Sequence, residues 1–129
     1  MKLGYTIAYV PDVTASLVFF ETAFGLSRRF LHDSGDYGEL DTGATTLAFA
    51  SHALGDMNFS SGIIRASEST QPLGMEIAFV TDDVAKSHQA ALDAGATELM
   101  APTAKPWGQT VSYVRCPAGT LVELCTPMG

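Results

Sequence analysis

Two glutamates, Glu76 and Glu123, lie inside short apolar segments, EIAFV and LVELC. A lone carboxylate in such a segment is unfavourable unless it faces solvent, a partner or a ligand. Strand alternation places Glu76 opposite Ile77 and Phe79, and it separates Glu123 from Leu124 in the same way. Two carboxylates in one hollow could act as general acid and base, because repulsion raises one pKa, or could bind a hard cation. The alternative is an exposed sheet edge without chemistry.

The elements that carry these glutamates occur twice in the sequence. Residues 5–16 (YTIAYVPDVTAS) are echoed by residues 76–87 (EIAFVTDDVAKS) at a constant offset of 71 positions. Each copy has an apolar strand, an aspartate that can cap a helix, a helix, and a terminating glycine, which is Gly25 or Gly95. A fixed internal period indicates one unit used twice, and two facing units enclose a cleft.

Periodicity and turn residues predict the same elements in both copies. The first copy predicts a helix from Asp12 to Gly25, and its predicted strands cover residues 3–10, 27–32, 36–41 and 45–50. The second predicts a helix over residues 83–94, and its predicted strands cover residues 75–80, 98–100, 110–115 and 120–125.

We therefore predict an α+β fold in which paired βαβββ modules form curved mixed sheets around a cleft. The first module is residues 1–52 and the second is residues 73–129, within one domain overall. The Ser- and Gly-rich stretch at 53–72 is expected to be a linker, with one short strand around Ile63 and Ile64.

Composition excludes several classes of function. The 129 residues are 47% hydrophobic, which is enough for one buried core. Seven basic and 14 acidic residues give a net charge of −7, which disfavours nucleic acid as a partner. No apolar stretch is long enough to span a membrane, so we expect a cytoplasmic protein. Two cysteines, Cys116 and Cys125, are expected to stay reduced in that compartment.

Two longer motifs resemble a known superfamily. The opening VPDVTASLVFFETAFGL is similar to the strand-to-helix signature of the vicinal oxygen chelate superfamily, and PWGQTVSYVRCPAGTLVEL is similar to its closing hairpin. That superfamily includes glyoxalase I, bleomycin-resistance proteins and extradiol dioxygenases. The resemblance covers nearly the whole chain. It implies paired βαβββ modules, usually in a homodimer, with modules pairing within or between chains.

The resemblance also implies four metal-ligand positions, on the first and last strands of each module. They fall on Tyr5 and Leu47 in the first module and on Glu76 and Glu123 in the second. Leucine cannot ligate, and a neutral tyrosine is a poor ligand for a divalent cation. Hence we expect no cofactor. The alternative is a divalent metal (Mn, Mg, Ni, Zn or Fe) bound weakly by the two carboxylates.

Aromatic side chains suggest a different use of the cleft. One face of the first strand and the closing hairpin could hold a planar ligand, and Arg115 could reach an anionic group. The ligand-binding candidates are Tyr5, Ile7, Tyr9, Trp107, Tyr113 and Arg115. The alternative is that Tyr9 and Tyr113 are core or dimer residues and that Arg115 forms a surface ion pair.

Two functions remain open. The first is a metal-free binder of a small aromatic or amphipathic molecule in a dimeric cleft, similar to the drug-resistance proteins. The second is a metal-dependent lyase, isomerase or dioxygenase built on Glu76 and Glu123 and completed by His32, Glu39 or water. Metal-free catalysis by the two carboxylates is a third possibility. His32 and His52 are expected in exposed loops, and His88 half-buried on a helix.

Overall fold

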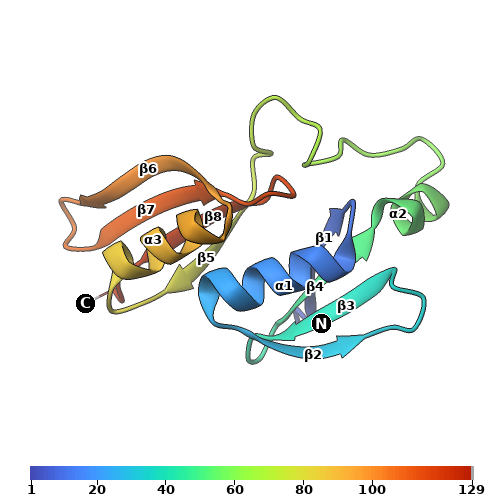
Figure 1. Cartoon of the computed structure of the whole chain (residues 1–129), viewed down its shortest axis with the longest axis horizontal. Helices are drawn as coiled ribbons and strands as arrows, with labels where there is room; N and C mark the ends of the chain where they lie inside the picture. The colour runs from blue at the N-terminus through green and yellow to red at the C-terminus, as the bar shows by residue number, and fades with distance from the viewer. Residues whose placement is uncertain (129) are drawn as a thin grey trace.

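The computed structural model describes residues 1–128, which form two four-stranded sheets side by side (Figure 1). The first four strands are β1 (Tyr5–Val10), β2 (Ser27–Leu31), β3 (Tyr37–Asp41) and β4 (Thr46–Ser51). The other four are β5 (Glu76–Val80), β6 (Thr97–Ala104), β7 (Thr110–Arg115) and β8 (Leu121–Cys125). The sheet orders, β1-β4-β3-β2 and β5-β8-β7-β6, correspond strand for strand. In each sheet the first and last strands pair in parallel and the other pairs are antiparallel, so the predicted α+β fold of paired βαβββ modules is confirmed.

The main helix of each module begins and ends at the predicted signals. Helix α1 (Val13–Phe24) starts after Asp12, whose side chain accepts a hydrogen bond from the Ala15 amide. It ends at Gly25, which adopts the left-handed conformation with φ 68°. Helix α3 (Val84–Ala94) repeats this arrangement, with an aspartate cap before it and a glycine after it.

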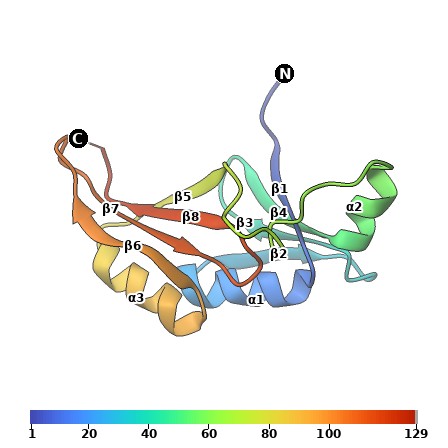
Figure 2. The same ribbon diagram turned by 90° about the horizontal axis from the view of Figure 1, so that it is seen from above.

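Both helices lie on the same side of the two sheets and contact each other (Figure 2). Phenylalanine rings join the modules at this contact. The ring centroid of Phe79, on β5, lies 5.0 Å from that of Phe24 and 6.3 Å from that of Phe20, both on α1. Phe20 also packs 4.9 Å from Phe49 on β4. One continuous hydrophobic core therefore spans the two modules.

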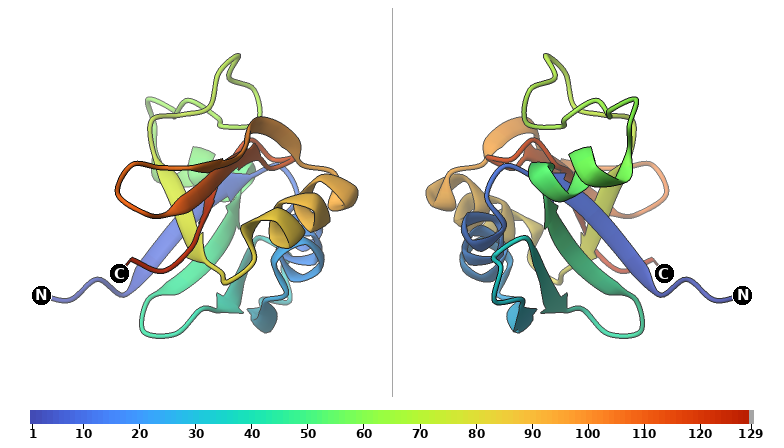
Figure 3. Two further views of the ribbon diagram at one scale, coloured as in Figure 1. Left: turned by 90° about the vertical axis from the view of Figure 1, so that its left-hand side faces the viewer. Right: turned by 90° about the vertical axis from the view of Figure 1, so that its right-hand side faces the viewer.

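The opposite faces of the sheets carry large side chains that remain exposed. The end views show α1 and α3 on one side only (Figure 3). On β1, Tyr5 is 58% and Ile7 is 44% exposed, and on β5 Val80 is 66% exposed. We call these the open faces of the sheets.

The segment between the modules differs from the prediction. Helix α2 (His52–Asn58) follows β4, with the Ser51 side chain as its cap. Its Gly55 lies against Tyr9, since an added Cβ would be 3.0 Å from the ring. The predicted strand at 63–64 is absent from the described structure, because this segment pairs with neither sheet. Residues 59–75, between α2 and β5, are called the linker below.

Within residues 1–128, no helix combines the length and apolar character needed to cross a bilayer. The cytoplasmic location stays a prediction. Cys116 and Cys125 are free thiols and are buried.

The ring contact between the modules generates the first testable prediction. Phe79→Ala should lower the free energy of unfolding by about 2 to 4 kcal/mol, because it empties space between Phe20 and Phe24. Val80→Ala, on the next residue and the opposite face, should change it by less than about 0.5 kcal/mol. Urea denaturation measures both values. Equal effects of the two substitutions would show that the ring contact does not hold the modules together.

Candidate functional site

A cleft of about 220 Å³ lies where β1, β5 and the linker meet. The strands place it, because Ile7 and Tyr9 face it from β1 while Glu76 borders it from β5. Its other main walls are apolar side chains from the linker, namely Ile63, Ile64 and Leu73. Glu76 is the one carboxylate among the described residues that line it. The structure therefore brings three residues predicted from sequence, Ile7, Tyr9 and Glu76, to one place.

Sequence reasoning did not identify the linker as a wall of this cleft. The signal was present, because two adjacent isoleucines, Ile63 and Ile64, interrupt a stretch rich in Ser and Gly. The prediction assigned them to a strand. In the structure they belong to no sheet, and Ile64 is 74% exposed.

Glu123 and Tyr113 stand beside Glu76 on the open face of the second sheet. The register aligns Glu123 with Ala78 on β5 and with Tyr113 on β7. The Tyr113 hydroxyl donates a hydrogen bond of 2.7 Å to Glu123 Oε1. The neighbouring core residues Val122 and Leu124 point to the helix side, as the alternation predicted. The two candidate carboxyl groups are thus neighbours.

The groups that surround Glu123 have raised pKa values. Burial, followed by the charge of Glu123 and a hydrogen bond with it, raises the pKa of Glu76 above its ordinary value. The hydrogen bond to Glu123, followed by burial, raises the pKa of Tyr113 to about 12. Burial and then Glu123 also raise the pKa of the Cys125 thiol. Glu76 therefore keeps its proton to higher pH than an isolated glutamate does. Such a pair can give or take one proton at the edge of the cleft.

The first module carries a tyrosine–glutamate pair of its own. The Tyr37 hydroxyl donates a hydrogen bond of 2.8 Å to Glu39 Oε2. Burial and this hydrogen bond raise the pKa of Tyr37. By register both residues share the open face with Ile7 and Tyr9.

The position assigned to Leu47 is corrected by the structure. Leu47 is 4% exposed and belongs to the hydrophobic core. Ala48, rather than Leu47, pairs with Ile7 as Glu123 pairs with Ala78. The reason is one extra residue between the turn glycine and the strand in the first module, which shifts the alternation by one side chain.

The donor set of one chain does not fit the four-ligand metal site that the resemblance implies. Its four positions hold Tyr5, Ala48, Glu76 and Glu123, of which only the two carboxyl groups are good ligands. Among residues 1–128 there is no group of three His, Cys, Asp or Glu side chains placed to hold an ion.

Trp107 and Arg115 lie outside the cleft. Trp107 is 62% exposed between β6 and β7, where its Nε1 donates to Gln109 Oε1 at 2.8 Å. The Arg115 guanidinium donates to backbone carbonyls of the linker, including Ala66 and Ser69. Its donors already have partners in the protein, so contact of Arg115 with an anionic ligand stays a prediction that this geometry does not favour.

Two of the three histidines, His88 and His32, have hydrogen-bond partners. His88 is 3% exposed, more deeply buried than predicted, because both ring nitrogens are satisfied. Its Nδ1 lies 2.9 Å from Ser112 Oγ and its Nε2 lies 2.8 Å from Glu98 Oε2. His32 Nδ1 lies 2.8 Å from Ser34 Oγ in the turn after β2. His52 begins helix α2 rather than lying in an exposed loop, and its buried Nε2 has no hydrogen-bond partner among the described residues.

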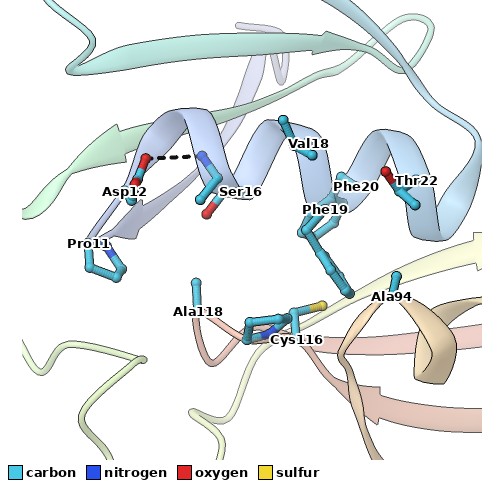
Figure 4. A pocket seen from close by; sticks show the side chains of 12 residues that line it. Pro11, Asp12, Ser16, Val18, Phe19, Phe20, Thr22, Ala94, Cys116 and Ala118 are labelled. Carbon is cyan, nitrogen blue, oxygen red and sulfur yellow. Dashed lines mark hydrogen bonds between the residues drawn. The ribbon is translucent and has the colours of Figure 1, made fainter.

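A larger cavity, about 490 Å³, lies on the helix side between α1 and the turn after β7 (Figure 4). Phe19 and Cys116 face it, and Val18 lies on its rim. Its charged group, Asp12, is occupied as the cap of α1, and burial raises the pKa of Cys116 to about 12. This cavity is larger but has no paired titratable groups, so the cleft at Glu76 is the candidate site.

Comparisons with known proteins agree with this architecture. A family model described as a glyoxalase-like domain matches residues 3–129. A glyoxalase/bleomycin resistance protein/dioxygenase family enzyme from Burkholderia phytofirmans PsJN is 21% identical with a TM-score of 0.81, covering 98% of each chain. A glyoxalase-related enzyme from Fulvimarina pelagi is 19% identical with a TM-score of 0.83, over 98% of this chain and 88% of that one. A member of the glyoxalase/bleomycin resistance protein/dioxygenase superfamily from Sphaerobacter thermophilus is 19% identical with a TM-score of 0.73, over 98% of each chain. No match was found among curated proteins.

The raised pKa of Glu76 generates a prediction about stability and pH. The folded state holds the proton of Glu76 more tightly than the unfolded chain does, so protonation of Glu76 stabilises the fold. This contribution to the free energy of unfolding is complete below pH 4.5 and is lost as pH rises through the folded pKa. Glutamine stays uncharged at every pH, so Glu76→Gln should not show this loss of stability. Its melting temperature should exceed that of the wild type by about 1 to 4 °C at pH 7 and should equal it near pH 4.

Differential scanning calorimetry at both pH values measures this difference. Asp33→Asn, in an exposed turn, removes one negative charge without touching the pair and is the control. A difference that is the same at both pH values, or that Asp33→Asn reproduces, would contradict the raised pKa of Glu76.

Proposed function

The chain belongs to the glyoxalase-like domain family, within the vicinal oxygen chelate superfamily, and from this we propose that it binds a small aromatic or amphipathic molecule in the cleft at Glu76. The observation that carries the proposal is the make-up of the cleft. Apolar side chains from both modules and the linker surround one carboxyl group. Concave apolar surface with a few polar groups is the usual composition of a small-molecule site.

The lining favours an uncharged or cationic ligand with a flat apolar part. Tyr9 offers a ring that is already fixed, edge to face, against Phe59 at 5.8 Å. Glu76 can accept a hydrogen bond, and in its protonated form can also donate one. Among the described residues that line the cleft there is no Lys, Arg or His to meet an anion.

We propose that the binding protein is a homodimer. Large side chains such as Tyr5, Met75 and Val80 are 58%, 70% and 66% exposed on or beside the open faces. A second copy that covered these faces would remove apolar surface from water and would deepen the cleft.

A metal-dependent lyase, isomerase or dioxygenase is the alternative, and the adjacency of Glu76 and Glu123 is the observation in its favour. Two carboxyl groups suit a hard, largely hydrated divalent ion. They do not suffice for the four-ligand site, so metal-free binding is the better-supported proposal.

Binding is tested by fluorescence titration with 1-N-phenylnaphthylamine, an uncharged aromatic probe. We expect saturable binding that Ile7→Asp weakens at least about tenfold, because the substitution introduces a carboxylate into the apolar wall. Val18→Asp is the matched control, since Val18 is also a half-exposed β-branched residue but borders the helix-side cavity.

Two outcomes would contradict this proposal. Loss of binding in Val18→Asp but not in Ile7→Asp would move the ligand to the helix-side cavity. Near-stoichiometric metal in protein purified without added metal, measured by plasma mass spectrometry and lost in Glu123→Gln together with probe binding, would support the alternative. Binding that persists in EDTA agrees with the metal-free proposal.

The homodimer is tested by sedimentation velocity. The wild-type chain should sediment with twice the mass of one chain, and Val80→Asp should shift it toward the monomer, because a charge would be placed in the covered face. Val18→Asp carries the same change on the helix side and should remain dimeric. A wild-type monomer at concentrations that saturate the probe would contradict the dimeric cleft.

A further inference from the structure

The linker forms one wall of the cleft although it has no strand or helix of its own. It arches from α2 across to β5 (Figures 1 and 3). A Ser- and Gly-rich segment without sheet pairing has high conformational freedom. Its position must therefore come from contacts with the modules. At its start Phe59 packs on Tyr9, and Arg65 pairs with Asp56 of α2 at 3.0 Å.

The contact with the second module is concentrated on one side chain, Arg115. Its Nη2 donates to Ala66 O at 2.8 Å, to Ser69 O at 2.9 Å and to Ser69 Oγ at 3.1 Å. Its Nη1 donates to Thr70 O at 3.2 Å, and its Nε to Gly119 O at 3.4 Å. The guanidinium thus bonds the linker and the turn before β8 at once. A planar fork of five donors can do this, whereas a lysine ammonium cannot.

Gly119 completes the same contact from the backbone side. A Cβ on Gly119 would lie 2.1 Å from the carbonyl oxygen of Ala66 and 2.8 Å from the amide nitrogen of Ser67. Its φ of 97° is also in the range that favours glycine. The turn therefore admits the linker backbone only because this residue has no side chain.

Arg115 and Gly119 contact the middle of the linker, and the large linker side chains that face the cleft lie on either side of this contact. Ile63 and Ile64 precede the contact, and Leu73 follows it. Gly119 itself borders the cleft, but Arg115 does not line it. Because Arg115 holds carbonyls that lie between Ile64 and Leu73, its loss would release both ends of the linker wall.

We propose that Arg115 and Gly119 form a latch that positions the linker as a wall of the cleft, so that Arg115 controls ligand affinity without touching the ligand. This inference rests on the proposed binding function. Arg115 is a positioning residue, and its effect reaches the ligand through the linker side chains. The positive charge serves the linker carbonyls and leaves the cleft without a cation.

The first test is Arg115→Lys, which keeps the charge and loses the fork. Amide exchange measured by NMR should accelerate at Glu68 and Ser69, whose amides bond to Arg65 O within the linker, by about tenfold. Exchange in α1 should change much less. The affinity for 1-N-phenylnaphthylamine should fall by about tenfold. Arg28→Lys, in the surface pair with Glu21, is the control and should alter neither quantity.

A second variant and a second probe separate the latch from other roles. Gly119→Ala should reproduce the faster linker exchange and the weaker binding while Arg115 remains in place. The anionic probe 8-anilinonaphthalene-1-sulfonate should bind the wild type more weakly than the neutral probe does, and in Arg115→Ala its affinity should fall by the same factor as that of the neutral probe. A much larger loss for the anionic probe would mean direct contact with the ligand and would overturn the proposal.

Three further results would also test the proposed role of Arg115 and Gly119. Unchanged linker exchange in Arg115→Lys and Gly119→Ala, or faster exchange with unchanged affinity, would overturn the latch. A uniform rise of exchange in the linker and α1 would assign Arg115 a general stabilising role and would overturn it too. If the wild type binds neither probe, the proposed binding function is wrong. The exchange rates then test only whether Arg115 and Gly119 hold the linker in place.

Discussion

The contact of Phe79 with Phe20 and Phe24 is the constraint on which the cleft depends. Each module could satisfy its backbone hydrogen bonds by itself, so backbone pairing does not fix the angle between the sheets. The shared aromatic core fixes this angle, because closely packed rings with centroids 5.0 and 6.3 Å apart tolerate little displacement. With the helices fixed against each other on one side, β1 and β5 are held close enough to border one cleft on the other.

Repetition fixes the architecture of the two halves but not their chemistry. On the helix side both modules carry apolar residues, whereas on the open faces the counterpart positions differ in chemistry. The counterparts by register are Tyr5 and Glu76, Ala48 and Glu123, and Glu39 and Tyr113. Both candidate carboxyl groups therefore lie in the second module, whereas the first module supplies apolar side chains of β1 to the cleft. A cleft bounded by unlike halves can orient an asymmetric ligand, which a strictly repeated one could not.

Prediction from sequence succeeds here where a local pattern sets the outcome. Strand alternation at Glu76 and Glu123, and the caps at Asp12 and Asp83, depend on neighbours a few residues away, and the structure has them as expected. It was wrong at Leu47, because one extra residue in a turn reverses which side chain faces the cleft. The contact by which Arg115 holds the linker was not predictable, since it joins residues more than 40 positions apart.

The cleft has a carboxyl group and apolar walls, and the nearby Arg115 is bonded to the linker rather than facing the cleft. Together these features constrain the class of ligand. Burial and then the neighbouring Glu123 raise the pKa of Glu76, so the carboxyl group binds a proton more tightly and its negative charge near the apolar wall is disfavoured. Arg115, which contacts the linker, is committed to backbone carbonyls, and Arg65, within the linker, is paired with Asp56 and Glu68. An anion entering the cleft would lose its hydration without gaining a cation in return. A neutral or cationic aromatic molecule would lose less and could use the carboxyl oxygens, so electrostatics and packing favour the same class of ligand.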